Sequence, residues 1–142
     1  MIVNVDVEIE RNRDEVFDLM ADARNEPTWN SRVSETELVS AEPIGVGSQF
    51  TTVNRGQQYT ATITSYDRAD EVTFAVAGRA MLIVGQLQFR DTEVGTALNG
   101  QFDMQPKGFM KFMLPLMAPA VRKDFPRQFA SFKSFCESRP HA

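Results

Sequence analysis

The chain has little of the chemistry on which many catalytic and metal sites depend. Its 142 residues include one cysteine, Cys136, and one histidine, His141. A single cysteine cannot form an internal disulfide. One histidine, which we expect to be a surface group, supports neither a Ser-His-Asp or Cys-His arrangement nor a Cys/His metal site. We therefore expect no metal and no other cofactor, and we interpret Cys136 as a buried or half-buried residue rather than a nucleophile.

Positive charge and long apolar runs are also scarce. There are 15 Lys and Arg against 19 Asp and Glu, a net charge of -4, so we expect no nucleic-acid partner. No stretch approaches the ~20 apolar residues of a membrane-spanning helix. Without a disulfide framework or a secretory leader, we expect a cytoplasmic protein. The length predicts a single domain over residues 1–142, as a monomer or a homodimer.

What is present is a series of short strands. Apolar and polar residues alternate from Val3 to Ile9, which is typical of a half-buried strand. The period then changes to that of a helix over 13–21, with Asn12 as a plausible N-cap. Further strands are expected at 34–41, 48–54, 58–66, 72–77, 81–90 and 95–104, and the short turns between them predict antiparallel pairing.

The chain closes with a long apolar stripe. Large apolar residues recur at steps of mostly three and four from Phe109 to Phe135, which predicts a long helix. Because Pro115, Pro119 and Pro126 each remove a backbone donor, we expect a bent or interrupted part over 108–118 and a regular helix over 120–137. The curved sheet is the partner that this stripe requires.

Alternation along the strands assigns the side chains that face this helix. The space between sheet and helix is either a filled core or a cavity with a few polar groups, and the residue pattern leaves both open. For a cavity, the weak catalytic candidate is Tyr59. The candidate ligand-binding residues are Trp29, Phe50, Thr52, Asn54, Tyr59, Ile63, Phe74, Met81, Ile83, Leu87, Phe102, Met104, Phe112, Met113, Leu116 and Met117.

Several segments, in order, resemble a known family. They are 14–17, 21–22, 25–29 (Asn-Glu-Pro-Thr-Trp), 43–50 (Pro-Ile-Gly-Val-Gly-Ser-Gln-Phe), 66–67 with 72–74, 93–96 and the closing helix. Together they resemble the START-like superfamily (SRPBCC), and within it the polyketide cyclase/dehydrase and lipid-transport group.

The resemblance implies an α+β helix-grip fold. In this fold a seven-stranded antiparallel sheet wraps around a long C-terminal helix, and two short helices follow the first strand. It also implies a deep pocket, which in relatives holds lipids, sterols, polyketides or plant hormones. Trp29 matches a family position and is expected to pack in the core or border the pocket entrance. No catalytic residue is carried over, because one fold hosts many functions.

Three functions remain open at this point. The first is binding of a small hydrophobic molecule, such as a lipid or polyketide. The second is a cyclase or dehydratase that orients a polyketide-like chain, with Tyr59 supplying a proton or a hydrogen bond. The third is an interaction module that docks on a protein or a membrane through the Met-rich segment around Phe112. An exposed apolar patch in that segment would favour the third.

Overall fold

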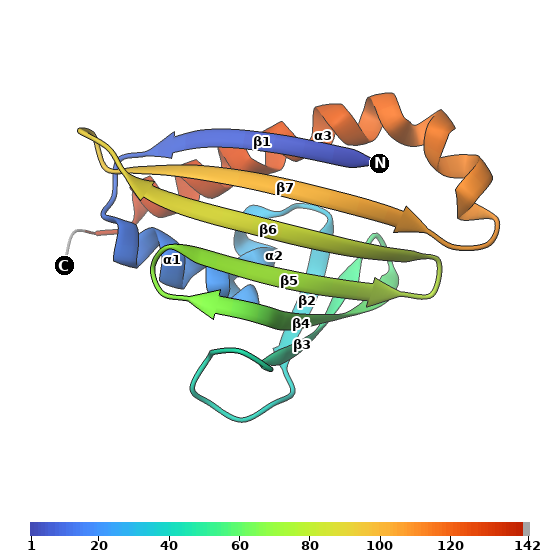
Figure 1. The fold of residues 1–142 in the computed structure, drawn as a ribbon, viewed down its shortest axis with the longest axis horizontal. Coiled ribbons are helices and arrows are strands. Elements are labelled where there is room, and N and C mark those ends of the chain that lie inside the picture. The colour runs from blue at the N-terminus through green and yellow to red at the C-terminus, as the bar shows by residue number, and fades with distance from the viewer. Residues whose placement is uncertain (141–142) are drawn as a thin grey trace.

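The computed structural model describes residues 1–140, so His141 and the expectation about it lie outside the described residues. Seven strands form one antiparallel sheet in the order β1-β7-β6-β5-β4-β3-β2 (Figure 1). The strands are β1 (Ile2–Ile9), β2 (Val33–Leu38), β3 (Gln49–Asn54), β4 (Gln57–Asp67), β5 (Glu71–Gly78), β6 (Met81–Asp91) and β7 (Thr96–Pro106).

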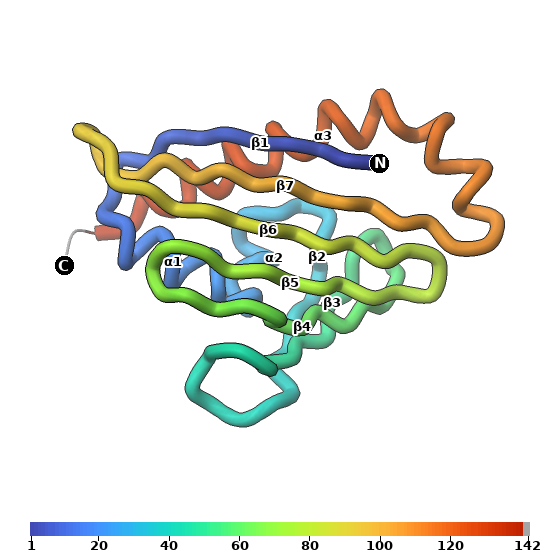
Figure 2. The backbone as a smooth tube through the Cα atoms, viewed as in Figure 1, coloured from blue at the N-terminus to red at the C-terminus, as the bar shows by residue number. Residues whose placement is uncertain are grey.

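The predicted architecture is confirmed. Two short helices, α1 (Arg13–Ala21) and α2 (Glu26–Trp29), follow β1 with the 3-10 turn η1 (Ala23–Asn25) between them, and α3 (Met110–Ser138) closes the chain. The helices lie on one face of the sheet (Figure 1). In Figure 2, β2 and β3 cross the direction of β6 and β7, so the sheet curves around that face. This is the helix-grip fold.

Local chemistry explains where α1 begins. The side chain of Asn12 accepts a hydrogen bond from the Glu15 backbone N–H at 2.9 Å, so the predicted N-cap is confirmed. The helix buries Phe17, whose ring meets the edges of Tyr66 and Phe89 at centroid distances of 5.3 and 5.0 Å. These contacts attach α1 to the sheet.

Two predicted boundaries differ from the structure by more than two residues. Strand β2 ends at Leu38 rather than at 41, because the hydroxyl of Ser40, and not a backbone carbonyl, accepts the hydrogen bond from the Gln49 N–H. The closing helix is continuous from Met110 to Ser138 despite its three prolines. It bends instead of breaking, as Figure 1 shows, because proline removes a hydrogen bond without ending a helix that tertiary packing holds.

The buried apolar side chains form two separate clusters. The large cluster joins α1, α2, the sheet and the C-terminal half of α3; it includes Phe17, Trp29, Phe50, Ile63, Leu87, Phe129 and Phe132. The small cluster lies near the start of α3 and consists of Val3, Met81, Met104 and Leu114. Phe102 and Phe125 pack against both clusters. The space between the clusters is where the candidate site lies.

Candidate ligand-binding cavity

A cavity of about 300 Å³ lies between the sheet, α2 and the inner side of α3. Its walls come from both apolar clusters, with Trp29 and Phe129 at one end and Met81 and Leu114 at the other. Many of the predicted residues meet here. The cavity is lined by Trp29, Thr52, Asn54, Tyr59, Phe74, Met81, Ile83, Leu87, Phe102, Met104 and Met117.

The other predicted positions do not line the cavity. Phe50 and Ile63 are fully buried within the large cluster. Met113 is half-buried outside the lining, and Phe112 and Leu116 are exposed. The physical reason is that both sides of α3 carry large apolar residues at helical spacing. Only the side that carries Met110, Leu114, Met117 and Val121 faces the cavity.

Two glycines leave room for aromatic rings in the wall of the cavity. Tyr59 and Gly78 are cross-strand partners on β4 and β5, and Phe102 and Gly85 are partners on β7 and β6. A Cβ at Gly78 would lie 2.4 Å from Cε1 of Tyr59, and one at Gly85 would lie 2.8 Å from Cε1 of Phe102. Each ring therefore lies directly over a residue without a side chain, and this placement shapes the cavity floor.

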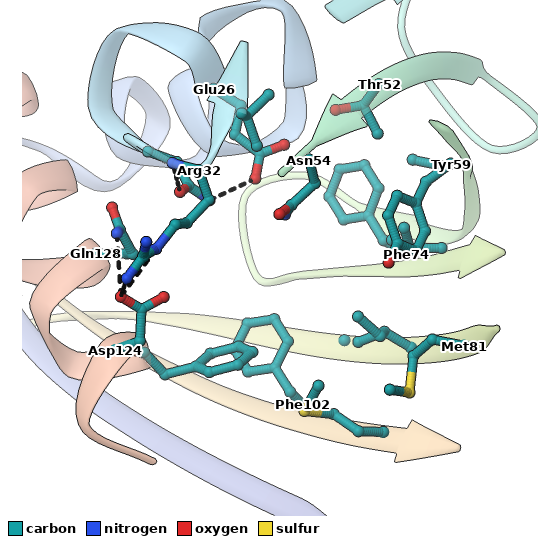
Figure 3. Close-up of a pocket in the computed structure, with 18 of the residues that line it drawn as sticks. Glu26, Arg32, Thr52, Asn54, Tyr59, Phe74, Met81, Phe102, Asp124 and Gln128 are labelled. Carbon is teal, nitrogen blue, oxygen red and sulfur yellow. Dashed lines mark hydrogen bonds and ion pairs between the residues drawn. The ribbon is translucent and has the colours of Figure 1, made fainter. Parts of the chain in front are cut away.

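A polar group lines one side of the cavity, and we call it the Asp124 cluster: Asp124, Arg32, Arg55 and Gln128. Figure 3 shows Arg32 and Gln128 beside Asp124. Arg32 Nη2 lies 2.9 Å and Arg55 Nη2 3.9 Å from the Asp124 carboxylate, to which Gln128 Nε2 also donates at 3.4 Å. Burial raises the pKa of Asp124, but the hydrogen bonds from Arg32 and Gln128 and the arginine charges outweigh it, so this pKa lies below its ordinary value. The cluster is an ionised link between Arg32 (directly before β2), the β3–β4 turn and α3.

Glu26 is one of the polar cavity residues that sequence reasoning missed. It is half-buried on α2, and its carboxylate accepts a hydrogen bond from Asn30 Nδ2 at 3.1 Å. Among the described residues no hydrogen bond reaches its other carboxylate oxygen. Burial raises the pKa of Glu26 to about 7, against a smaller lowering by the Asn30 hydrogen bond.

A signal for Glu26 was present in the sequence. Glu26, Trp29 and Asn30 stand at i, i+3 and i+4, which is one side of a helix, and all three line the cavity. Figure 3 shows the Glu26 carboxyl near Asn54 and Thr52 of β3, across the cavity from Phe102 and Met81. The cavity therefore has a polar end and an apolar end.

The acid–base candidates differ in their surroundings. Tyr59 packs beside the small cluster, and in Figure 3 no hydrogen bond joins its hydroxyl to the other residues drawn. Cys136 is fully buried in the large cluster, and burial raises the pKa of its thiol to about 12, so the interpretation of Cys136 as a buried residue is confirmed. Within residues 1–140, no three His, Cys, Asp or Glu side chains gather as a metal site would require.

A comparison with family models gives one match over almost the whole chain. The model described as polyketide cyclase / dehydrase and lipid transport matches residues 1–137. No curated protein matches the chain. Among the described residues, none of the helices combines the length and the apolar character needed to cross a membrane.

Solved structures with the same fold are remote in sequence. A START superfamily protein from Mycobacterium smegmatis has a TM-score of 0.71 at 17% identity, covering 97% of this chain and 95% of its own. A protein from Thermus thermophilus has a TM-score of 0.77 at 15% identity, with 96% and 97% covered. Ara h 8.0201 has a TM-score of 0.72 at 11% identity, with 98% and 99% covered. At these identities the likeness concerns the fold.

Proposed function

Because the chain belongs to the polyketide cyclase/dehydrase and lipid transport family, we propose that it binds a small hydrophobic molecule in the cavity between the sheet and α3. The cavity itself carries this proposal. Its volume of about 300 Å³ stands at the lower end of the ~300–1,000 Å³ typical of small-molecule sites. That size favours one compact molecule over a long-chain lipid.

The distribution of polar groups suggests the kind of ligand. Glu26, Thr52 and Asn54 lie at one end of a cavity whose remaining walls are mostly apolar. Asn30, which donates a hydrogen bond to Glu26, also lines the cavity. One oxygen of the Glu26 carboxylate has no hydrogen bond from the described residues, and a donor on a ligand in the cavity can supply one. We therefore propose a ligand with an apolar body and, at one end, a hydroxyl or similar group that donates to the free oxygen of Glu26. Polyketides and other oxygenated hydrophobic molecules have this character.

The test measures uptake of a neutral fluorescent probe, 1-aminoanthracene, by two variants of β6. Ile83 lines the cavity, whereas its neighbour Leu82 is absent from the lining, as expected for adjacent residues on opposite faces of a strand. Ile83→Arg places an unpaired charge in the apolar wall. We expect it to weaken probe binding at least ~tenfold, which corresponds to about 1.4 kcal/mol. Leu82→Arg is the matched control and keeps the affinity.

Two results would contradict the proposal. Wild-type protein that takes up neither 1-aminoanthracene nor any molecule detectable by native mass spectrometry would indicate a cavity that does not bind. Equal affinity of folded Ile83→Arg and Leu82→Arg protein would place the probe outside this cavity.

A second candidate function, acid–base catalysis, is favoured by Glu26. A carboxyl with a pKa of about 7 is close to half ionised at neutral pH, so it can both accept and donate a proton. In a dehydration, the carboxylate would take a proton from the carbon next to a ketone and then donate that proton to the β-hydroxyl, which leaves as water as the C–O bond breaks and the C=C bond forms. The residue for this role is Glu26 rather than Tyr59, because Glu26 stands at the polar end of the cavity.

The catalytic candidate has its own test. An aromatic β-hydroxy ketone is incubated with the protein, and the conjugated enone product is followed by its absorbance. Glu26→Gln abolishes product formation if Glu26 moves the proton, while Tyr59→Phe retains most of it. Unchanged turnover in Glu26→Gln protein would remove the catalytic role and leave binding.

A further inference from the structure

The first turns of α3 expose an apolar stripe. Phe109, Phe112 and Leu116 are 73%, 75% and 76% exposed. Their spacing of three and four residues places them on one side of the helix, and we call them the outer stripe. Elsewhere in the described part of the chain, the exposed large apolar side chains are aliphatic and lie on β1 or in connecting loops: Ile2, Val39, Val46 and Val94.

The fold does not require the outer stripe. Met110, Leu114 and Met117 line the cavity from the other side of the same helix, and they already supply the apolar face that attaches this part of α3 to the sheet. Figure 1 shows these first turns at one end of the molecule, away from the C-terminal end of α3. Two exposed phenylalanines and a leucine close together indicate a surface that binds another molecule or a membrane.

The charge around the outer stripe indicates what covers it. Residues 104–123 contain Lys107, Lys111, Arg122 and Lys123 and no Asp or Glu. All four basic side chains are exposed. The segment therefore carries +4 in a chain of net charge -4, so the remaining residues carry -8. A partner of negative charge is attracted to this segment and repelled by the rest of the protein.

We propose that the outer stripe docks the protein on an anionic phospholipid bilayer. Phe109, Phe112 and Leu116 enter the boundary between head groups and acyl chains, as the apolar side of an interfacial helix does. Lys107 and Lys111 lie at the head-group level, where basic side chains are attracted to anionic lipids. A second copy of the chain fits this surface less well, because pairing two outer stripes would bring their basic residues together.

Docking in this orientation would place the cavity wall next to the bilayer. The same turns of α3 that carry the outer stripe carry Met110, Leu114 and Met117 into the cavity. An apolar molecule could then move between bilayer and cavity with a short passage through water. The docking surface itself does not depend on the cavity being filled, so the two proposals are tested separately.

The test is co-sedimentation of the full chain with vesicles of phosphatidylcholine alone or mixed with phosphatidylglycerol. We expect sedimentation with the mixed vesicles at low salt and weaker binding at high salt. The double variant Phe112→Ser, Leu116→Ser removes two insertion side chains and should lose at least ~tenfold in vesicle affinity. The control is the double variant Val39→Ser, Val46→Ser, which replaces exposed apolar residues far from α3 and should bind as wild type does.

A charge variant separates electrostatic attraction from the insertion of apolar side chains. Lys107→Glu with Lys111→Glu should remove the preference for vesicles that contain phosphatidylglycerol. Binding of 1-aminoanthracene should be unchanged in both α3 variants, which distinguishes a docking failure from a failure of the cavity. The proposal is overturned if wild-type protein does not bind the mixed vesicles, or if the outer-stripe variant binds them as tightly as the wild type does. A dimer that disappears in the outer-stripe variant would also overturn it, by assigning the surface to a second copy.

Discussion

Glu26 should make the stability of the protein depend on pH in a range where few other groups titrate. Its half-buried carboxyl faces the cavity and accepts a hydrogen bond from Asn30. Burial raises its pKa from 4.5 to about 7. The folded state therefore holds this proton more tightly than the unfolded state does.

The sign and size of the effect follow from that difference. The folded protein has its full stability below pH 4.5, where Glu26 is protonated in both the folded and the unfolded state. As pH rises toward 7, the unfolded state loses this proton first, and the folded protein loses stability. The span from 4.5 to about 7, at about 1.4 kcal/mol for each pH unit, gives a loss of about 3 kcal/mol. Above pH 7 the loss is complete.

The variant Glu26→Gln tests this reasoning. The amide cannot ionise, and its oxygen can still accept the hydrogen bond from Asn30. We expect the variant and the wild type to have similar free energies of unfolding in urea at pH 4. At pH 8 the variant should be more stable by about 3 kcal/mol.

The comparison of two proteins at each pH removes the contribution of other titrating groups. Glu93→Gln, at an exposed position in the β6–β7 turn, is the control and should follow the wild type. If Glu26→Gln and the wild type show the same dependence on pH from 4 to 8, the raised pKa of Glu26 in the folded protein is refuted.

Three further predictions concern the walls and the core. In Gly78→Val, the new side chain should collide with the Tyr59 ring and lower the free energy of unfolding in urea by ~1–3 kcal/mol. It should also weaken 1-aminoanthracene binding. An unchanged stability and an unchanged probe affinity would mean that the ring can move aside. Asp124→Ala should cost ~1–2 kcal/mol at pH 7 by breaking its hydrogen bonds with Arg32 and its neighbours. The pKa of Asp124 lies below its ordinary value, so the stability that its carboxylate adds is lost in acid. The difference in free energy of unfolding between wild type and variant should therefore shrink as pH falls below the ordinary pKa of an aspartate. A difference that grows in acid would contradict this assignment. Cys136 should resist iodoacetamide at pH 8 until the protein unfolds, since its thiol is fully buried with a pKa of about 12; mass spectrometry of the native protein would reveal any early labelling.

The sheet and its inward residues could be predicted because a strand has a period of two. In β6, alternation alone placed Ile83 and Leu87 on the inward face, and both line the cavity. The same holds for Phe102 and Met104 of β7. Once an alternating strand is recognised, its buried face follows without knowledge of distant contacts.

The sides of α3 could not be predicted in the same way. Phe112 and Leu116 are as apolar as Leu114 and Met117, and helical spacing groups each pair equally well. Only the sheet decides which pair faces inward. The sequence pattern therefore indicated a helix with more apolar surface than one partner covers, and the structure leaves the excess as the outer stripe.

The polar end of the cavity depended on contacts between distant segments. Asp124 meets Arg32 across 92 positions of the chain, and neither residue stands out within its own segment. Glu26, Trp29 and Asn30 are spaced as on one side of a helix, but α2 has only four residues, so the spacing alone does not indicate which side is buried. Charged residues in short helices are usually exposed, so burial of Glu26 became evident only from the fold.

The most direct test of ligand binding in the cavity is a nuclear magnetic resonance titration of the methyl groups with 1-aminoanthracene. We expect shifts at Ile83, Leu87, Met104 and Met117, which line the cavity, and none at the exposed Val46. Shifts confined to Leu116 and its exposed neighbours, or no shifts at saturating probe, would contradict binding between the sheet and α3.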